Sequence, residues 1–491
     1  MILLKMGLMA SLLAALLVVP CFYLCRCKRT WGLPVLFIVC FGLIPIVFLF
    51  YSILSIPANL PFWDDYNAII QYVILSFPDR MQRLFSLHNQ HRIVTVRLFL
   101  ECMMAICGKV SFKMCMLVGS AQLLVIFACF CLLYIKQFGK CIGMILAFDS
   151  CWLIFSLQNF ENAFWALTAL QNFGVIMWAF LAIILFHFRN RRFFCVLSWL
   201  CAVAAILTSA QGLAVLVVFM LMLFLPSHDQ CSDEERTTWA SLMKQIITRL
   251  KNAYNVSGLL ATICFIVVCS SIYLRGYVPG GVELRSASAS LSDKLLYVLA
   301  FLGNPALLLP VALFIGFFVA LAFVVVVISF PRLPILVRPL FFFSLFLIAC
   351  DVAGVNFRAE SPYAGVCYRY YIIVACLYVS LLGLLFSLFC TSGRTKFIAA
   401  TFVSFCCVLV PLFFTLLFWV QLHERSESLR VNFLRWPHDI NGLRNDEAAL
   451  VDSSLALERM ERLGLYDHNA VKRKDERLPE SLLPWAELHF P

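Results

Sequence analysis

A pair of adjacent carboxylates, Asp64 and Asp65, stands in the segment Phe62-Trp63-Asp64-Asp65-Tyr66, just beyond a long uncharged apolar run. Carboxylates at such a boundary are costly to desolvate and add nothing to a hydrophobic core. Chemistry or ion binding at a membrane interface is the interpretation that explains them. Repulsion within the pair raises the proton affinity of one carboxylate, which suits a general base. The sequence leaves open which of the two would be that base.

Two imidazoles and a guanidinium follow in the segment His88-Asn89-Gln90-His91-Arg92. These side chains are able to bind a metal or a phosphate. The alternative is a hydrated polar loop tip. We favour a functional cluster because His88, His91 and Arg92 concentrate between apolar stretches.

A third polar segment runs from Gln158 to Trp165 and contains Glu161. It joins two apolar runs on the same side as the acidic pair. Trp165 and Glu161 are candidates for substrate binding. The alternative is an interfacial aromatic belt with polar caps, in which Trp165 is the anchor.

Late in the chain, Arg369 stands where an apolar run begins, beside Tyr370 and other aromatic residues, and Arg358 precedes it in the same loop. A guanidinium in this position can hold a lipid-linked phosphate by bidentate hydrogen bonds. The alternative is an arginine that only snorkels toward the headgroups.

The composition of the chain indicates a membrane protein. Hydrophobic residues make up 63% of its 491 residues and charged residues 13%, against roughly 25% charged in soluble domains. The net charge of +11 comes mostly from short basic clusters between apolar runs, so nucleic acid is not the expected partner. Most of the 22 cysteines lie inside apolar runs, where cysteine acts as a small hydrophobe, so we predict no disulfide framework or zinc site.

Twelve apolar runs are candidates for spans, since a spanning helix needs roughly 20 such residues. The runs are 6–24, 32–56, 114–135, 141–157, 164–188, 193–208, 210–226, 257–273, 306–330, 339–357, 369–390 and 397–421. If all cross, six basic clusters share one side: Arg26 to Arg29, Lys136 to Lys140, Arg189 to Arg192, Lys244 to Lys251, Arg332 to Arg338 and Arg394 to Lys396. The positive-inside rule makes that side cytoplasmic, and the acidic pair then faces outward.

The segment 92–107 is apolar enough to cross, but Arg97 and Glu101 share one helical face. A helix lying flat at the interface fits this pattern and keeps the basic clusters on one side. We therefore predict an all-α polytopic protein with a long first outer loop, 57–113, that carries interfacial helices. Its divisions are an N-terminal anchor helix with a basic turn at 1–31, a membrane domain at 32–421 and an outer tail at 422–491 with a capped amphipathic helix that stops at Gly464.

As a set, these motifs resemble those of bacterial multi-spanning glycosyltransferases with the GT-C architecture. They are the acidic pair, the His-Asn-x-His-Arg segment, the Glu-Asn-x-x-Trp segment and the late Arg-Tyr, within residues 32 to 390. Among these enzymes, the chain is similar to the O-antigen glucosyltransferases of serotype conversion. It departs from the usual pattern at Gln90, where an acidic residue is common, and by the extra leading run 6–24.

The resemblance implies an inverting transfer of a sugar, glucose in these relatives, from polyprenyl phosphate to a glycan such as lipid-linked O-antigen. This modification of lipopolysaccharide would occur at the periplasmic face of a bacterial inner membrane. It implies that Asp64 or Asp65 is the base and that Arg92 and Arg369, with Tyr370, hold the donor phosphate. His88, His91, Glu161, Trp165 and Arg358 are then the substrate-binding candidates. The mechanism requires no cofactor, although it leaves room for a divalent cation.

Two other classes of function remain open. One is a transporter or flippase of a lipid-linked sugar or small solute, with Asp149, Asp351 and Arg369 as a relay across the membrane. Against it, the ionisable residues concentrate at outer span ends and in loops, whereas transporters place them near the midplane. The other is a non-enzymatic scaffold or a partner of a polysaccharide polymerase.

Overall fold

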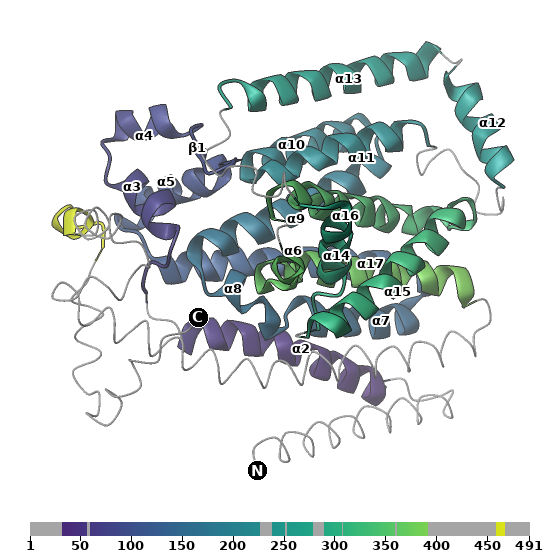
Figure 1. The fold of residues 1–491 in the computed structure, drawn as a ribbon, viewed down its shortest axis with the longest axis horizontal. Helices are drawn as coiled ribbons and strands as arrows, with labels where there is room; N and C mark the ends of the chain where they lie inside the picture. The colour runs from purple at the N-terminus through teal and green to yellow at the C-terminus, as the bar shows by residue number, and fades with distance from the viewer. Residues whose placement is uncertain are drawn as a thin grey trace.

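A computed structural model of the chain describes residues 32–55, 59–225, 238–250, 253–277, 289–306, 308–358, 361–390 and 458–466. The expected anchor helix at 6–24, the last expected span at 397–421 and most of the tail at 422–491 lie outside these residues. The described part is predominantly helical (Figure 1), as expected for an all-α protein. Two strands of two residues each are its whole sheet.

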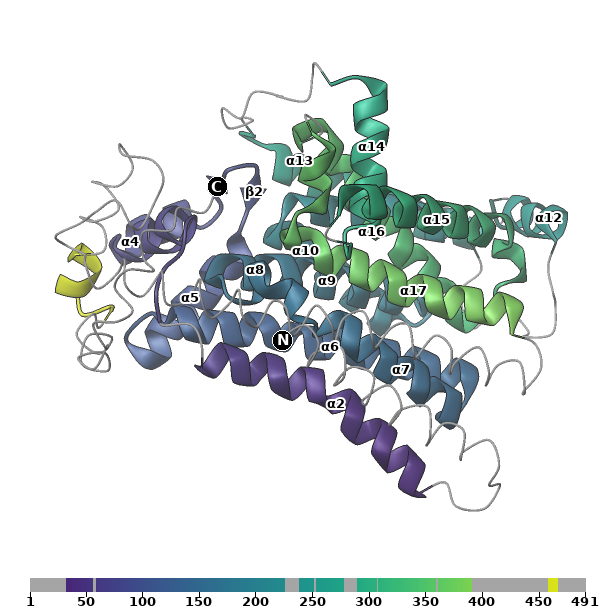
Figure 2. The ribbon, with the colours of Figure 1, turned by 60° about the horizontal axis from the view of Figure 1, so that its bottom comes forward.

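The long helices form a bundle whose members run in broadly similar directions (Figures 1 and 2). They are α2 (Gly32–Ser55), α6 (Phe112–Phe138), α7 (Lys140–Ile154), α9 (Ala166–His187), α10 (Arg192–Thr208), α11 (Ala214–Leu223), α13 (Ala253–Leu274), α15 (Leu309–Ile328), α16 (Arg338–Arg358) and α17 (Tyr371–Phe389).

Six helices of the described residues are long and apolar enough to cross a membrane. They are Phe112–Phe138, Ile142–Ala163, Ala166–His187, Leu309–Ile328, Ile335–Val355 and Tyr368–Phe389. Four shorter apolar helices coincide with further expected spans: Gly42–Ser55, Arg192–Thr208, Ala210–Leu223 and Leu260–Leu274. The chain is thus an all-helical membrane protein with six candidate spans in its described part, while the full set of twelve remains a prediction.

Helix α9 lies at the centre of the bundle and packs against α6, α10, α11 and α16. Stacked aromatic rings join these helices. Phe180 stacks on Phe343 with centroids 4.0 Å apart, and Phe186 stacks on Phe219 at 4.1 Å. Offset ring pairs of this kind add to the stabilisation from burial alone. The core is therefore built from the aromatic residues of neighbouring apolar runs.

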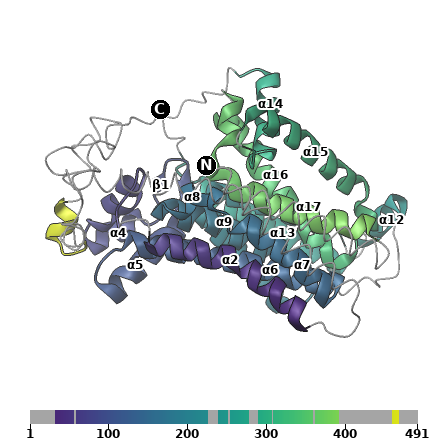
Figure 3. The same cartoon turned by 90° about the horizontal axis from the view of Figure 1, so that it is seen from below.

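Short elements gather at one end of the bundle, and α12 (Trp239–Leu250) crosses the other end (Figures 1 and 3). Those near the first outer loop are η1 (Tyr66–Ile70), α3 (Gln71–Val73), α4 (Phe77–Arg83), β1 (Leu87–His88), β2 (His91–Arg92) and α5 (Val94–Cys107). The other short elements are η2 (Leu157–Asn159), α8 (Phe160–Ala163), η3 (Ala210–Leu213), α14 (Leu291–Leu302), η6 (Phe330–Arg332), η7 (Ile335–Val337), η8 (Pro362–Val366) and η9 (Tyr368–Tyr370).

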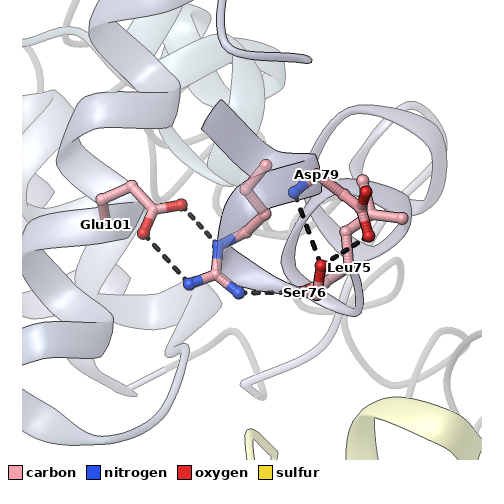
Figure 4. A network of polar contacts seen from close by, with 5 residues as sticks. Leu75, Ser76, Asp79 and Glu101 are labelled. Carbon is pink, nitrogen blue, oxygen red and sulfur yellow. Dashed lines mark hydrogen bonds and ion pairs between the residues drawn. The ribbon is translucent and has the colours of Figure 1, made fainter. Parts of the chain in front are cut away.

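The loop helices α4 and α5 are tied together by a bidentate ion pair (Figure 4). Arg80 Nε lies 2.6 Å from Glu101 Oε1, Arg80 Nη2 lies 3.2 Å from Glu101 Oε2, and Nη1 donates to the carbonyl of Leu75. Ser76 caps α4 by accepting from the amide of Asp79. Because both partners of the pair are largely shielded from water, this contact fixes the two helices more firmly than an exposed pair would.

The sequence predicts that α5 lies flat at the interface, with Arg97 and Glu101 on one helical face. Its 14 residues span about 21 Å, less than the roughly 30 Å of hydrocarbon, and it is not among the candidate spans. Arg97, however, is buried, and its Nη1 donates to the carbonyls of Arg83, Leu84 and Ser86. The polar face of α5 therefore holds the loop together, while Leu98 and Ile106 are exposed.

A short piece of the tail, residues 458–466, docks on the loop between α2 and α6. The amide of Val110 donates to Leu465 O at 2.8 Å, and the hydroxyl of Tyr466 donates to Asn59 O at 2.7 Å. The predicted stop at Gly464 is confirmed: its φ is +69°, and Leu465 N bonds back to Met460 O, as in a Schellman motif. The tail and the acidic loop thus share one end of the molecule.

Candidate functional site

The acidic loop meets the start of α9 through Asp65. Its Oδ1 accepts a hydrogen bond from the amide of Leu167 at 2.9 Å, and its Oδ2 accepts one from the amide of Phe62 at the same distance. Leu167 lies in the first turn of α9, where an amide has no partner within the helix. Asp65 is 0% exposed and therefore acts as a cap supplied from a distant part of the chain.

The environment of Asp65 has opposing effects on its ionisation. Burial, the largest effect, raises the pKa of this carboxyl to about 7 from 3.8. The hydrogen bonds from Phe62 and Leu167 lower the pKa, and the charge of Asp64 raises it. Asp65 is thus shielded from water, and this burial opposes its ionisation. In this respect Asp65 differs from Asp64.

Asp64 remains partly exposed, whereas Asp65 is closed off. The charge of Asp64 acts on the imidazole of His88, which is 9% exposed. Burial lowers the pKa of His88, and Asp64 works in the opposite direction. Within the described residues, His88 Nε2 has no hydrogen-bond partner. The structure therefore brings the predicted acidic pair and the first histidine together, with a buried ring nitrogen that has no hydrogen-bond partner among the described residues.

Arg369 lies in the same place, between two indoles. Its Cζ is 5.8 Å from the ring centre of Trp63 and 5.3 Å from that of Trp165. A guanidinium over an aromatic face is attracted by the ring quadrupole. Its buried Nε has no hydrogen-bond partner in the described part of the chain. Arg369 is thus held over Trp63, the residue that precedes Asp64, and its Nε stays without a hydrogen-bond partner among the described residues.

Trp63 itself has an unusual backbone, with φ at +45°. A bulky residue in this region costs of order 1–3 kcal/mol and persists only where its surroundings enforce it. Here Trp63 stacks on Phe62 at 5.4 Å and meets Trp165 edge-on at 5.7 Å. Its ring stays 42% exposed. This strained backbone conformation leaves the side chain of Trp63, immediately before Asp64, partly exposed to solvent.

The segment with Glu161 joins this cluster from α8, just before α9 begins. Asn162 Nδ2 donates to Arg369 O at 2.9 Å, and Asn172 Nδ2 donates to Asn162 Oδ1. Glu161 Oε2 lies 3.7 Å from Cys367 Sγ. The expected proximity of Glu161, Trp165 and Arg369 is therefore present. Sequence reasoning missed Asn162, although its place one residue after Glu161 was a usable signal.

His91 and Arg92 face away from this cluster toward other helices. His88 pairs with His91 in a hairpin whose turn contains Asn89 at φ +51°. His91 Nδ1 accepts from the amide of Ala210 at 3.3 Å. The hairpin therefore directs its two histidines to different surroundings.

All three nitrogens of the Arg92 guanidinium donate to backbone carbonyls. Nε donates to Tyr273 O, Nη1 to Phe85 O and Nη2 to Arg275 O. These bonds tie the hairpin to the end of α13. The hydrogen bonds of Arg92 thus have a structural role, and they do not support its predicted role in binding phosphate.

Four further predicted residues remain. Tyr370 packs against Phe301 of α14 with ring centroids 5.4 Å apart. Arg358 ends α16 and Asp149 lies in α7, but their side chains lie outside what the structure describes. Asp351 of α16 is 1% exposed, and both its carboxylate oxygens have no hydrogen-bond partner among the described residues.

The described residues contain no group of three or more His, Cys, Asp or Glu side chains arranged to hold a metal ion. The expectation that a divalent cation is compatible with the site therefore stays a prediction. Of the groups that stand together, Asp64 and His88 supply proton acceptors, Arg369 supplies positive charge, and Trp63 supplies an exposed ring.

Comparison of the chain with protein families, with curated proteins and with solved structures gave no match in any of the three.

Proposed function

We propose that the chain is an inverting glycosyltransferase that moves a sugar from polyprenyl phosphate to a glycan acceptor at the outer end of its bundle. In this proposal it has the twelve-span, GT-C-like architecture expected from the sequence, in a bacterial inner membrane. The donor sugar is glucose and the acceptor is lipid-linked O-antigen or a similar glycan. Nucleotide sugars are absent outside the cytoplasm, so a donor there must already be attached to a lipid.

The observation that carries the proposal is the position of Arg369 over the rings of Trp63 and Trp165. Trp63 directly precedes Asp64, so the fold brings the segment that carries Asp64 against Arg369, which comes from a distant part of the chain. A base beside a fixed cation is what transfer from a phosphodiester requires, because negative charge develops on the leaving phosphate.

In the proposed reaction, Asp64 accepts the proton of an acceptor hydroxyl as its oxygen bonds to the anomeric carbon of the donor. The bond from that carbon to the phosphate oxygen breaks, and its electron pair leaves with polyprenyl phosphate. Arg369 offsets the charge that forms on the phosphate. Attack from the face opposite the leaving group inverts the anomeric centre.

The geometry favours Asp64 over Asp65 as the base. Both oxygens of Asp65 accept backbone hydrogen bonds and are shut off from solvent, so an acceptor hydroxyl has no approach to them. Asp65 instead fixes the loop against the first turn of α9 and thereby positions Asp64. The exposed ring of Trp63 is suited to pack against the apolar face of a sugar.

A transport function is the second candidate, and Asp351 is the observation that favours it. A buried carboxylate in a candidate span, with no hydrogen-bond partner in the described part of the chain, is the kind of group that transporters use. Proteoliposomes loaded with polyprenyl-phosphate glucose and lacking acceptor separate the two candidates. A flippase exchanges the lipid between leaflets there, whereas a transferase leaves it unchanged until acceptor is added.

The test of the proposal is transfer by purified protein supplied with polyprenyl-phosphate glucose and lipid-linked O-antigen. We expect release of polyprenyl phosphate, and a loss of at least about 100-fold in kcat for Asp64→Asn. Asp79→Asn is the matched control, because Asp79 is an exposed carboxylate in the same loop. Arg369→Ala should lose activity likewise, with Arg192→Lys as the control at the opposite end of the bundle.

A folded Asp64→Asn variant that transfers as fast as Asp79→Asn would contradict the assignment of the base. Absence of transfer by the wild type with any lipid-linked sugar, together with lipid exchange in the proteoliposomes, would favour transport.

A further inference from the structure

Helix α12 carries a stripe of exposed apolar side chains. Trp239, Met243 and Ile247 are 48%, 51% and 51% exposed and recur every four residues, which places them along one side of the helix. Leu242, on an adjacent side, is buried against the rest of the protein. The apolar surface of α12 is thus wider than its contact with the bundle requires.

The stripe is held at the level where a candidate span ends. Trp239 Nε1 donates to the carbonyl of Ile328, the last residue of α15, at 2.9 Å. The ring of Trp239 also lies 6.4 Å from that of Phe330. Tryptophan is enriched at this depth because its ring is apolar and its N–H is polar. The start of α12 is therefore fixed at the end of a candidate span.

The direction of α12 agrees with this position. In Figure 1 it runs across the bundle, at the end opposite the loop elements α3 to α5, whereas most of the long helices run along the bundle. A helix at the boundary and roughly perpendicular to the spans lies in the plane of the membrane surface.

The charges of the helix are of one sign. Lys244, Arg249 and Lys251 lie in and just after α12, and the sequence has no acidic residue from Trp239 to Val282. The acidic residues 233–235 precede the helix and lie outside the described residues. Basic residues beside an apolar stripe are typical of helices that bind anionic membranes.

We propose that α12 is an interfacial helix that binds anionic phospholipids at the end of the bundle opposite the candidate site. Trp239, Met243 and Ile247 enter the boundary between headgroups and acyl chains. The positive charges that the sequence has at positions 244, 249 and 251 attract the phosphates of the headgroups. This contact supplies a partner for side chains that are exposed among the described residues, and it does not depend on the proposed transferase activity.

Hydrogen–deuterium exchange of the full-length protein in lipid nanodiscs tests the proposal. We expect amides of the 239–250 peptide to exchange at least about tenfold more slowly in phosphatidylglycerol-containing discs than in pure phosphatidylcholine discs. The Lys244→Gln, Arg249→Gln, Lys251→Gln triple variant should lose this difference. The matched control is Arg459→Gln with Arg462→Gln, which removes exposed cations at the other end and should keep it.

Unchanged exchange rates of α9 peptides will show that each variant is folded. Equal exchange of the 239–250 peptide in both lipids would overturn the proposal, as would slow exchange retained by the triple variant. Met243→Asp adds a second criterion. It places a charge within the stripe and should speed exchange in both lipids, whereas no effect would contradict insertion of the stripe.

Discussion

Replacement of Asp65 by asparagine tests how burial and helix capping compete at the loop that carries the candidate base. The carboxyl is 0% exposed, and its pKa is raised from 3.8 to about 7 because burial outweighs two backbone hydrogen bonds. The folded protein therefore binds the proton of Asp65 more tightly than the unfolded chain does.

The sign of the pH effect follows from this difference. The contribution of Asp65 to the free energy of unfolding is greatest below pH 3.8, falls as the pH rises toward 7 and is constant above pH 7. A difference of about 3 pKa units at about 1.4 kcal/mol each gives a loss of about 4 kcal/mol across this window. Full burial means that solvent screening does not reduce this figure.

Asparagine has nearly the same shape as aspartate, and its side chain does not titrate. Its amide offers one acceptor oxygen in place of two, so either the Phe62 or the Leu167 amide loses a partner, at a cost of about 1–3 kcal/mol. That cost is independent of pH. We therefore expect the stability of Asp65→Asn relative to the wild type to rise by about 4 kcal/mol between pH 4 and pH 8.

Equilibrium unfolding in detergent, followed by tryptophan fluorescence at several pH values, measures this difference. Asp79→Asn is the control, since Asp79 is exposed and its replacement should leave the pH profile of the wild type unchanged. A pH-independent difference between wild type and Asp65→Asn would refute the reasoning. A difference of opposite sign would mean that the two amide bonds outweigh burial.

Three further outcomes are expected. Tyr466→Phe removes the hydroxyl that donates to Asn59 O and should raise proteolysis of the tail, while leaving the stability of the bundle within about 1 kcal/mol; equal proteolysis of both proteins would show that this bond does not hold the tail. Arg97→Gln leaves up to three loop carbonyls without their donor and should destabilise by about 3 kcal/mol in chemical unfolding, whereas a neutral result would mean that water replaces the guanidinium. Asp351→Leu removes an unpartnered buried carboxylate and should raise the thermal midpoint without loss of transferase activity; loss of activity in a folded variant would instead assign Asp351 a functional role.

The apolar runs were readable from the sequence because helix formation across a bilayer is a local matter. A run of about 20 apolar residues satisfies its own backbone hydrogen bonds and needs no distant partner to do so. The described spans fall where the runs predicted them. The stop at Gly464 was equally local, since glycine adopts a positive φ at little cost.

The hairpin at His88 to Arg92 was not predicted. Its strands are two residues long, which is too short for a period-2 pattern to show. The burial of Arg97 was not predicted either. Its spacing from Glu101 indicated a polar helix face, but the carbonyls that surround it come from residues 83 to 86, whose fold the spacing does not encode.

From the sequence alone came the membrane class, the positions of most described helices and the set of polar residues in the outer loops. Only the tertiary structure showed that residues of the same type have different contacts. Asp65 caps a helix that begins a hundred residues later while Asp64 stays accessible, and Arg92 binds three carbonyls while Arg369 rests on two indoles. The physical reason is that the ionisation and availability of a side chain depend on burial and on the groups around it. Those groups come from segments far apart in the chain, and only folding brings them together.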